Sequence, residues 1–170
     1  MFVGLRLIAA VALVGLAVIL AWGLVLGPAP IHQPLLYNHN VHVEEEGLEC
    51  IDCHESVEQA AYATIPRLNL CLDCHDTEPM SESPEEAKLI AHIESEEEIA
   101  WNQVYRVPSH VYFSHRRHVT LGEVECSVCH GNVPEQMVPV QAPVIPLTME
   151  WCMDCHTENK VSNDCLACHR

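Results

Sequence analysis

The sequence predicts a fold class with little regular secondary structure, in which short helices and loops pack around covalently attached groups, plus one N-terminal transmembrane helix. Three observations lead to this class. Residues 7–26 form an uninterrupted apolar run, the rest of the chain is strongly acidic and poor in large apolar side chains, and all ten Cys lie in five copies of one short motif. A chain with so few large apolar side chains needs cross-links or bound groups to build an interior.

The apolar run has the length of a membrane span. From Leu7 to Leu26 no residue carries a charge, and the indole of Trp22 is the one hydrogen-bonding side chain. A helix of this length covers roughly 30 Å, the thickness of a bilayer's hydrocarbon core. A cleaved signal peptide, the alternative, usually has a shorter apolar part and a small-residue cleavage site, whereas Gly27-Pro28 is a helix stop. We therefore expect residues 1–30 to be an uncleaved membrane anchor.

Every Cys belongs to a Cys-x-x-Cys-His motif, the attachment sequence of c-type haem. The five copies are Cys50-Ile51-Asp52-Cys53-His54, Cys71-Leu72-Asp73-Cys74-His75, Cys126-Ser127-Val128-Cys129-His130, Cys152-Met153-Asp154-Cys155-His156 and Cys165-Leu166-Ala167-Cys168-His169. Two thiols at this spacing can each form a thioether with one haem, and the adjacent imidazole can bind its iron. Zinc would explain the Cys pairs but not the His after each pair. The sequence thus predicts five covalent haem c groups, with these five His as proximal ligands.

The charge of the chain limits its partners and its location. After residue 30, seven Lys and Arg face twenty-four Asp and Glu, a formal charge of 7 − 24 = −17. This balance argues against nucleic acid and anionic membrane surfaces, which bind the opposite sign. Because c-type haem is attached on the outer side of the cytoplasmic membrane, we expect the haem-bearing part to be periplasmic or otherwise extracytoplasmic.

An internal repeat supplies candidates for the distal ligands. Tyr37-Asn38-His39-Asn40-Val41-His42 and Phe113-Ser114-His115-Arg116-Arg117-His118 share an aromatic-x-His-x-x-His pattern, and in both the second His precedes a motif Cys by eight positions. The repeat predicts two two-haem modules, residues 31–80 and 110–157, joined by an acidic helical connector at 81–109 and followed by a fifth haem motif at 158–170. One His of each element is expected to cap a haem of its own module, and the other a neighbouring haem.

The fifth distal ligand is less firmly indicated. His110 is the favoured candidate, Met149 is its rival because a thioether is also a common sixth ligand, and His32 is weaker. In the connector, Ser83 as N-cap and Pro84 at the first position predict a helix over residues 84–98, exposed to solvent.

Several phrases of the sequence resemble a known family. The run from Arg106 to His115 (Arg-Val-Pro-Ser-His-Val-Tyr-Phe-Ser-His), the run from Met149 to His156 and the N-terminal anchor look like the pentahaem cytochrome subunit of alternative complex III. The two-haem modules also resemble class III cytochromes of the c3/c7 type.

This resemblance implies an electron-transfer subunit that is not an enzyme on its own. It would be a single-pass protein of the bacterial inner membrane, in a complex that oxidises quinol and reduces a periplasmic carrier. The implied partners are an iron–sulfur subunit, a quinol-oxidising membrane subunit and a monohaem cytochrome c.

Two alternative functions remain open at this point. A direct quinol dehydrogenase of the NapC/NrfH type characteristically has Met two residues after a motif His, but the residues found there are Ser56, Thr77, Asn132 and Glu158. A reductase would need one five-coordinate haem, which depends on whether the fifth distal ligand exists. Electron paramagnetic resonance would separate this reading from a wholly six-coordinate electron wire.

Overall fold

The computed structural model describes Gly4, Ile8 and residues 11–20 and 29–169. The chain divides into two compact units, Met1–Pro30 and Ile31–Arg170. In the first unit, residues 11–20 are helical, while the remainder of the expected span, including residues 21–26, lies outside the described residues. Among the helices that are described, none has both the length and the hydropathy of a membrane span.

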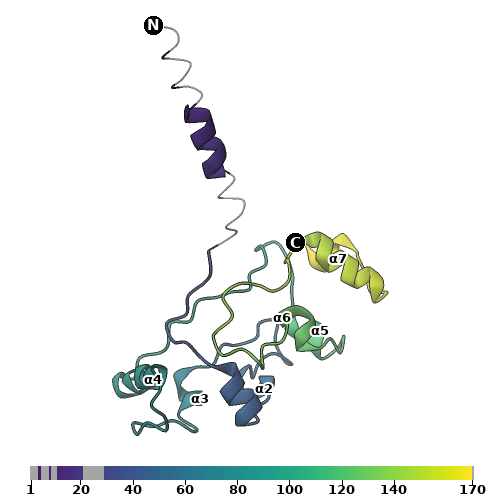
Figure 1. Ribbon diagram of the computed structural model, residues 1–170. Helices are drawn as coiled ribbons and strands as arrows, with labels where there is room; N and C mark the ends of the chain where they lie inside the picture. Colours follow the sequence, from purple (N-terminus) through teal and green to yellow (C-terminus); the bar gives the residue numbers. More distant parts are fainter. Residues whose placement is uncertain (1–3, 5–7, 9–10, 21–28, 170) are drawn as a thin grey trace. The chain divides into compact units, whose positions relative to one another are not determined.

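The second unit is built from short helical elements joined by irregular segments (Figure 1). They are η1 (Val41–Glu45), α2 (Cys50–Cys53), α3 (Leu68–Cys71), α4 (Pro84–Ser95), α5 (His115–Val119), α6 (Cys126–His130), α7 (Met149–Glu158) and α8 (Cys165–Cys168). Within residues 29–169 the only β pairing is an isolated bridge between Val111 and His169. The short helices and irregular segments agree with the fold class that the sequence predicts, whereas the transmembrane helix of that prediction is not found among the described residues.

Helix α4 begins where its sequence predicts and ends three residues early. The Ser83 hydroxyl accepts a hydrogen bond from the Glu85 amide at 3.3 Å, and Pro84 occupies the first turn. The helix stops at Ser95 because Glu96 adopts a left-handed conformation with φ of 54°. Consecutive carboxylates at residues 96–98 oppose continuation, since negative charge is unfavourable at a helix C-terminus.

The small aliphatic core lies around α4. It consists of Leu35, Leu68, Leu89 and Ile99, against which Tyr37, Cys71, Ile93 and Trp101 pack. One face of α4 is therefore buried against the segment that carries the second haem motif. The expectation of a solvent-exposed connector is wrong for this face, because Leu89 places it in the core.

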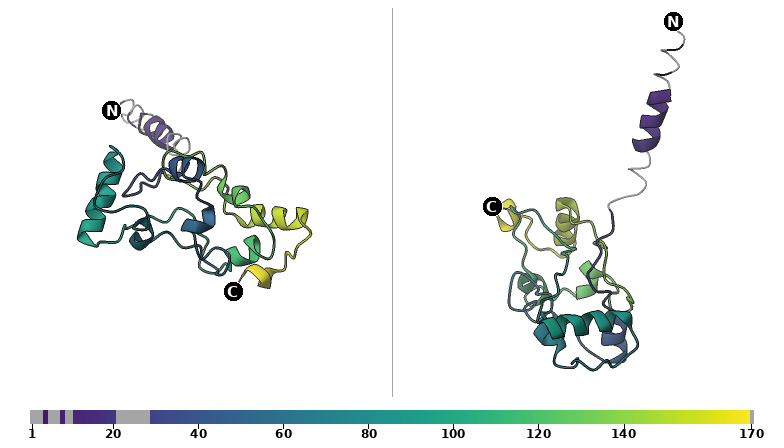
Figure 2. Two further views of the ribbon diagram at one scale, coloured as in Figure 1. Left: turned by 90° about the horizontal axis from the view of Figure 1, so that it is seen from below. Right: turned by 90° about the vertical axis from the view of Figure 1, so that its left-hand side faces the viewer.

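The helices of the second unit follow one another across the molecule in a definite order. Two views show α4 and α3 at one end, α2 next, α5 and α6 in the middle, and α7 at the opposite end (Figures 1 and 2). Residues 31–80 and 110–157, the two predicted modules, therefore follow one another in space, with α5 and α6 near α2.

Candidate functional site

The haem motifs adopt helical or turn backbone, which explains their spacing: the fourth lies within α7, and the second begins at the last residue of α3 and continues as a turn. Residues i, i+3 and i+4 lie on one face of a helix, so the two Cys and the His of a motif project on the same side. The turn is closed by a backbone hydrogen bond from the His amide to the carbonyl of the first Cys, at 2.9 Å for His54 and 2.8 Å for His75 and His169. All ten Cys are free of disulfide bonds.

Three of the five predicted proximal His lie opposite another His at a distance suited to a shared metal ion. The ring centroids lie 6.2 Å apart for His42 and His75, 6.4 Å for His115 and His130, and 6.2 Å for His118 and His156. An imidazole nitrogen binds a transition metal at roughly 2.0–2.1 Å, so two rings on opposite sides of one ion have centroids about 6.4 Å apart. The observed distances therefore fit bis-His ligation of a haem iron.

His110 faces the proximal His of the last motif. Its ring lies 5.6 Å from that of His169 with an interplanar angle of 18°, a somewhat shorter separation than in the other pairs. The backbone holds the two segments together, because the Tyr112 amide donates to the Cys168 carbonyl at 2.7 Å and Val111 forms a bridge with His169. The rival candidate Met149 begins α7 and is 64% exposed.

His39 lies near the remaining proximal residue, His54, without a ring contact between them. Burial, and then the nearby charges of His54 and His42, lower the pKa of His39 to about 4. Its Nδ1 atom is buried without a hydrogen-bond partner. A buried imidazole with an unsatisfied nitrogen and a depressed pKa is neutral, as a metal ligand must be.

The aromatic residue of each repeat contacts both His of its element. In each case the aromatic ring stands edge-on to the first His and lies flat against the second. Tyr37 lies 4.8 Å from His39 at 83° and 4.3 Å from His42 at 27°, while Phe113 lies 4.9 Å from His115 at 89° and 4.6 Å from His118 at 21°. The internal repeat therefore extends from sequence to three-dimensional geometry.

Hydrogen bonds fix which ring nitrogen is free in several of these His. The Nδ1 atoms of His42 and His118 lie 2.8 Å from the carbonyl oxygens of Asn38 and Ser114. Because a carbonyl oxygen only accepts, Nδ1 carries the proton and Nε2 keeps its lone pair for a metal. The proximal His54 and His156 show the same arrangement, at 2.7 Å from the Thr64 carbonyl and 2.9 Å from the Ser162 carbonyl.

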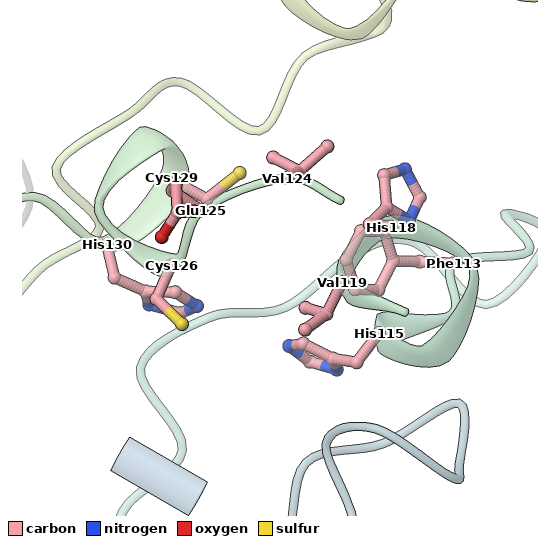
Figure 3. A pocket seen from close by; sticks show the side chains of 9 residues that line it. All are labelled: Phe113, His115, His118, Val119, Val124, Glu125, Cys126, Cys129 and His130. Atoms are coloured by element: carbon pink, nitrogen blue, oxygen red, sulfur yellow. The ribbon is translucent and has the colours of Figure 1, made fainter. Parts of the chain in front are cut away.

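The third motif opens onto a hollow lined by apolar side chains and by both His of the second element (Figure 3). Its lining consists of Phe113, His115, His118, Val119, Val124, Glu125, Cys126, Cys129 and His130. The motif side chains lie on one side, and Phe113 with the two distal His on the other. Burial lowers the pKa of His115 and His130, which favours the neutral imidazole needed for ligation.

The sequence does not indicate two residues that contact the predicted proximal His. Tyr105 packs against His130 with ring centroids 4.6 Å apart, and its hydroxyl donates to the Cys129 carbonyl at 3.4 Å. The Glu86 carboxylate lies 3.3 Å from Nδ1 of His75. Neither residue belongs to a motif, and each contact joins segments separated by a loop, so nothing local in the sequence marks them.

Cysteines of different motifs lie near one another, which indicates the spatial order of the sites. Burial raises the pKa of four Cys, and the charge of a Cys from another motif adds to this: Cys53 for Cys71, Cys50 for Cys126, Cys155 for Cys129 and Cys168 for Cys152. Backbone bonds support the central junction, since the amides of His115 and Arg116 donate to the carbonyls of Ala61 and Ala60, each at 3.0 Å. The motifs therefore follow the order second, first, third, fourth, fifth.

Comparisons with known proteins agree with this picture. Residues 111–170 match the family model described as cytochrome c7 and related cytochrome c. The chain is 32% identical, over 185 aligned positions, to the protein named menaquinone reductase, multiheme cytochrome c subunit, of Nitratidesulfovibrio vulgaris strain Hildenborough. The alignment covers 92% of this chain and 88% of that relative.

Proposed function

Because this chain belongs to the multihaem cytochrome c family that includes the menaquinone reductase subunit, we propose that it relays electrons through five covalent haem c groups within a quinone-linked membrane complex. The observation that carries the proposal is the pairing of imidazoles at metal-sharing distance. It goes together with the five attachment motifs, which account for every Cys in the chain.

We assign two protein ligands to each iron. The pairs, distal residue first, are His39 with His54, His42 with His75, His115 with His130, His118 with His156, and His110 with His169. A c-type haem supplies a one-electron couple whose potential depends on its axial ligands, and bis-His ligation favours lower potentials than His/Met ligation. If each iron is held by its two assigned imidazoles, the subunit would offer no open position for a substrate. Its role is electron transfer without bond chemistry.

The spatial order of the motifs supports an unbranched relay. In the proposed relay the second motif, at Cys71–His75, and the fifth, at Cys165–His169, are the two ends, and the other three motifs carry electrons between them. Electrons would then enter at one end motif and leave at the other. The modules at 31–80 and 110–157 form the two halves of this relay, and residues 158–170 extend it.

The N-terminal segment is proposed to hold the relay at the membrane. Residues 1–30 form a separate unit whose described part includes a helix at 11–20 with exposed apolar side chains such as Val14 and Ile19. Such a segment is suited to a lipid environment. The second unit would lie on the periplasmic side of the bacterial inner membrane, where c-type haem is attached.

The partners and the direction of electron flow are part of the proposal. The resemblance to alternative complex III favours quinol oxidation, with an iron–sulfur subunit, a quinol-oxidising membrane subunit and a monohaem cytochrome c as partners. The name of the menaquinone reductase relative favours the opposite direction, towards the quinone. Both directions use the same relay, because a chain of one-electron carriers conducts either way.

Purification of the tagged chain from membranes tests this function. A pyridine haemochrome assay should return five haems per chain, and the associated subunits identify the complex. Mixing the complex with menaquinol and an oxidised periplasmic cytochrome, and separately with menaquinone and the reduced cytochrome, gives the direction. Fewer than five haems would contradict the relay, and quinol oxidation by the isolated chain would instead indicate a NapC/NrfH-type dehydrogenase.

A further inference from the structure

Glu86 is a buried carboxylate beside a proximal His at one end of the relay. Only 8% of the residue is exposed, and its Oε1 atom lies 3.3 Å from Nδ1 of His75. Three donors hold it in place: the Met80 amide at 2.8 Å, the Ser81 amide at 2.7 Å and the Ser81 hydroxyl. These protein contacts by themselves hold the Glu86 carboxylate in position.

The sequence of α4 explains why a carboxylate is stable there. Glu86 is the third residue of the helix, and negative charge near a helix N-terminus is favoured by the helix dipole. One turn later, Leu89 is buried with Leu68 and against Cys71 of the second haem motif. Core packing of α4 therefore brings Glu86 to His75.

The equivalent position in the second module has a different partner. His156, the second proximal His of that module, has its Nδ1 atom 2.9 Å from the Ser162 carbonyl, and His54 likewise faces the Thr64 carbonyl. Those partners are neutral, whereas Glu86 carries a full charge. Among the contacts of the described residues, His75 is the only proximal imidazole that meets a carboxylate.

We propose that Glu86 tunes the haem at Cys71–Cys74 to a lower reduction potential than its counterpart at Cys152–Cys155. The inference rests on the proposed ligation of that haem by His75. The Nδ1 atom of His75 is buried and has no hydrogen-bond partner, and the Glu86 carboxylate lies at ion-pair distance from it. The negative charge favours a proton on this nitrogen and makes the other ring nitrogen a stronger donor, which stabilises the more positive ferric iron. Glu86 is a positioning and tuning residue, because it acts through His75 and touches no haem atom in this argument.

Such tuning distinguishes one end of the relay from its interior. The second motif lies at one terminus of the motif order, and the neutral carbonyl partners belong to interior motifs. A terminal site of distinct potential favours electron exchange with one partner rather than a uniform distribution of electrons along the chain.

The test compares Glu86→Gln with Glu94→Gln in the purified complex. Both variants remove one negative charge from α4, but Glu94 is solvent-exposed and far along the helix from Glu86. In a spectroelectrochemical titration, Glu86→Gln should raise one midpoint by about the 59 mV that corresponds to a tenfold change in a one-electron equilibrium. Glu94→Gln should leave all midpoints in place.

Two further readouts keep the inference falsifiable. Glu86→Asp keeps the negative charge and should therefore keep part of the lowered reduction potential. A purely structural role of Glu86 predicts no such effect of charge. In the unmodified complex, near-infrared magnetic circular dichroism should separate one ferric haem from the others, because a more basic axial imidazole moves its charge-transfer band to higher energy. A single undivided band would overturn the inference even if Glu86→Gln failed to load its haem.

The outcomes separate this inference from the proposed function. Five haems per chain with unshifted midpoints in Glu86→Gln would refute the tuning role and leave the relay intact. A haem deficit in the unmodified chain would refute the relay itself.

Discussion

The imidazole rings of His118 and His156 lie 6.2 Å apart between centroids, although one belongs to α5 and the other to α7. The rings of His42 and His75 repeat this distance in the first module. In both modules the second His of the aromatic element faces the second motif, and the structure places the first His near the first motif. Each element therefore joins the two sites of its own module.

Replacing His118 with Ala should convert one haem from low spin to high spin. The substitution leaves His156 as the only protein ligand at its site, and a five-coordinate ferric haem gives an axial high-spin signal. Electron paramagnetic resonance should show about one fifth of the low-spin intensity lost. His92→Ala is the control, since His92 lies in α4 and bonds the Glu97 carbonyl. A wholly low-spin spectrum of His118→Ala would contradict the assigned pair.

Replacing Phe113 with Leu should loosen both distal His of the second element. The change removes an edge-on contact and a stacked contact while keeping apolar volume. We expect a loss of about 0.5–1.5 kcal/mol in the free energy of unfolding, measured by thermal denaturation. Tyr62→Leu serves as control because that ring is 75% exposed. Equal destabilisation by both variants would count against the ordering role of Phe113.

Replacing Leu89 with Ala should destabilise the first module and perturb one haem. Leu89 is buried in the core that holds α4, and such truncations cost about 2–5 kcal/mol. Chemical denaturation would measure the loss, and redox titration should show a change at a single midpoint. Glu94→Ala, on the exposed face of the same helix, should change neither quantity. Midpoint shifts spread over all haems would show that the effect of α4 is not local.

Replacing Cys165 and Cys168 with Ser together should remove one haem and leave four. The fifth motif ends the proposed order, so its loss should not interrupt the contacts among the other motifs. A haemochrome assay should return four haems per chain, with electron transfer to one partner abolished. The matched variant Cys50→Ser with Cys53→Ser removes an interior site instead. It should disturb the neighbouring midpoints, because Cys53 lies near enough to Cys71, and Cys50 to Cys126, to contribute to the raised pKa of each.

Deleting residues 1–30 and supplying a cleavable secretion signal should release the haem-bearing unit from membranes. Residues 31–170 form a compact unit of their own, so the released protein should keep its haem content. Cell fractionation with haem staining would measure both properties. Retention of the truncated chain in membranes that lack its partner subunits would contradict the anchor.

The sequence determined the attachment chemistry and the local structure of this protein. The fixed spacing within Cys-x-x-Cys-His dictates one helical turn, so the position of each motif follows from residues that are adjacent in the chain. The same holds for the start of α4, where Ser83 and Pro84 satisfy the first backbone amides locally. The repeated aromatic element also indicated four distal candidates, because identical spacing is visible without a structure.

Only the tertiary structure decided which imidazoles face one another and which motifs are neighbours. Those relationships depend on how loops without a hydrophobic pattern return to the same place, as when the amide of Tyr112 meets the carbonyl of Cys168. The burial of Glu86 against His75 is of this kind, since its surrounding sequence is that of an exposed acidic helix. Local spacing is set by covalent geometry, whereas long-range pairing is set by packing that no short stretch of sequence contains.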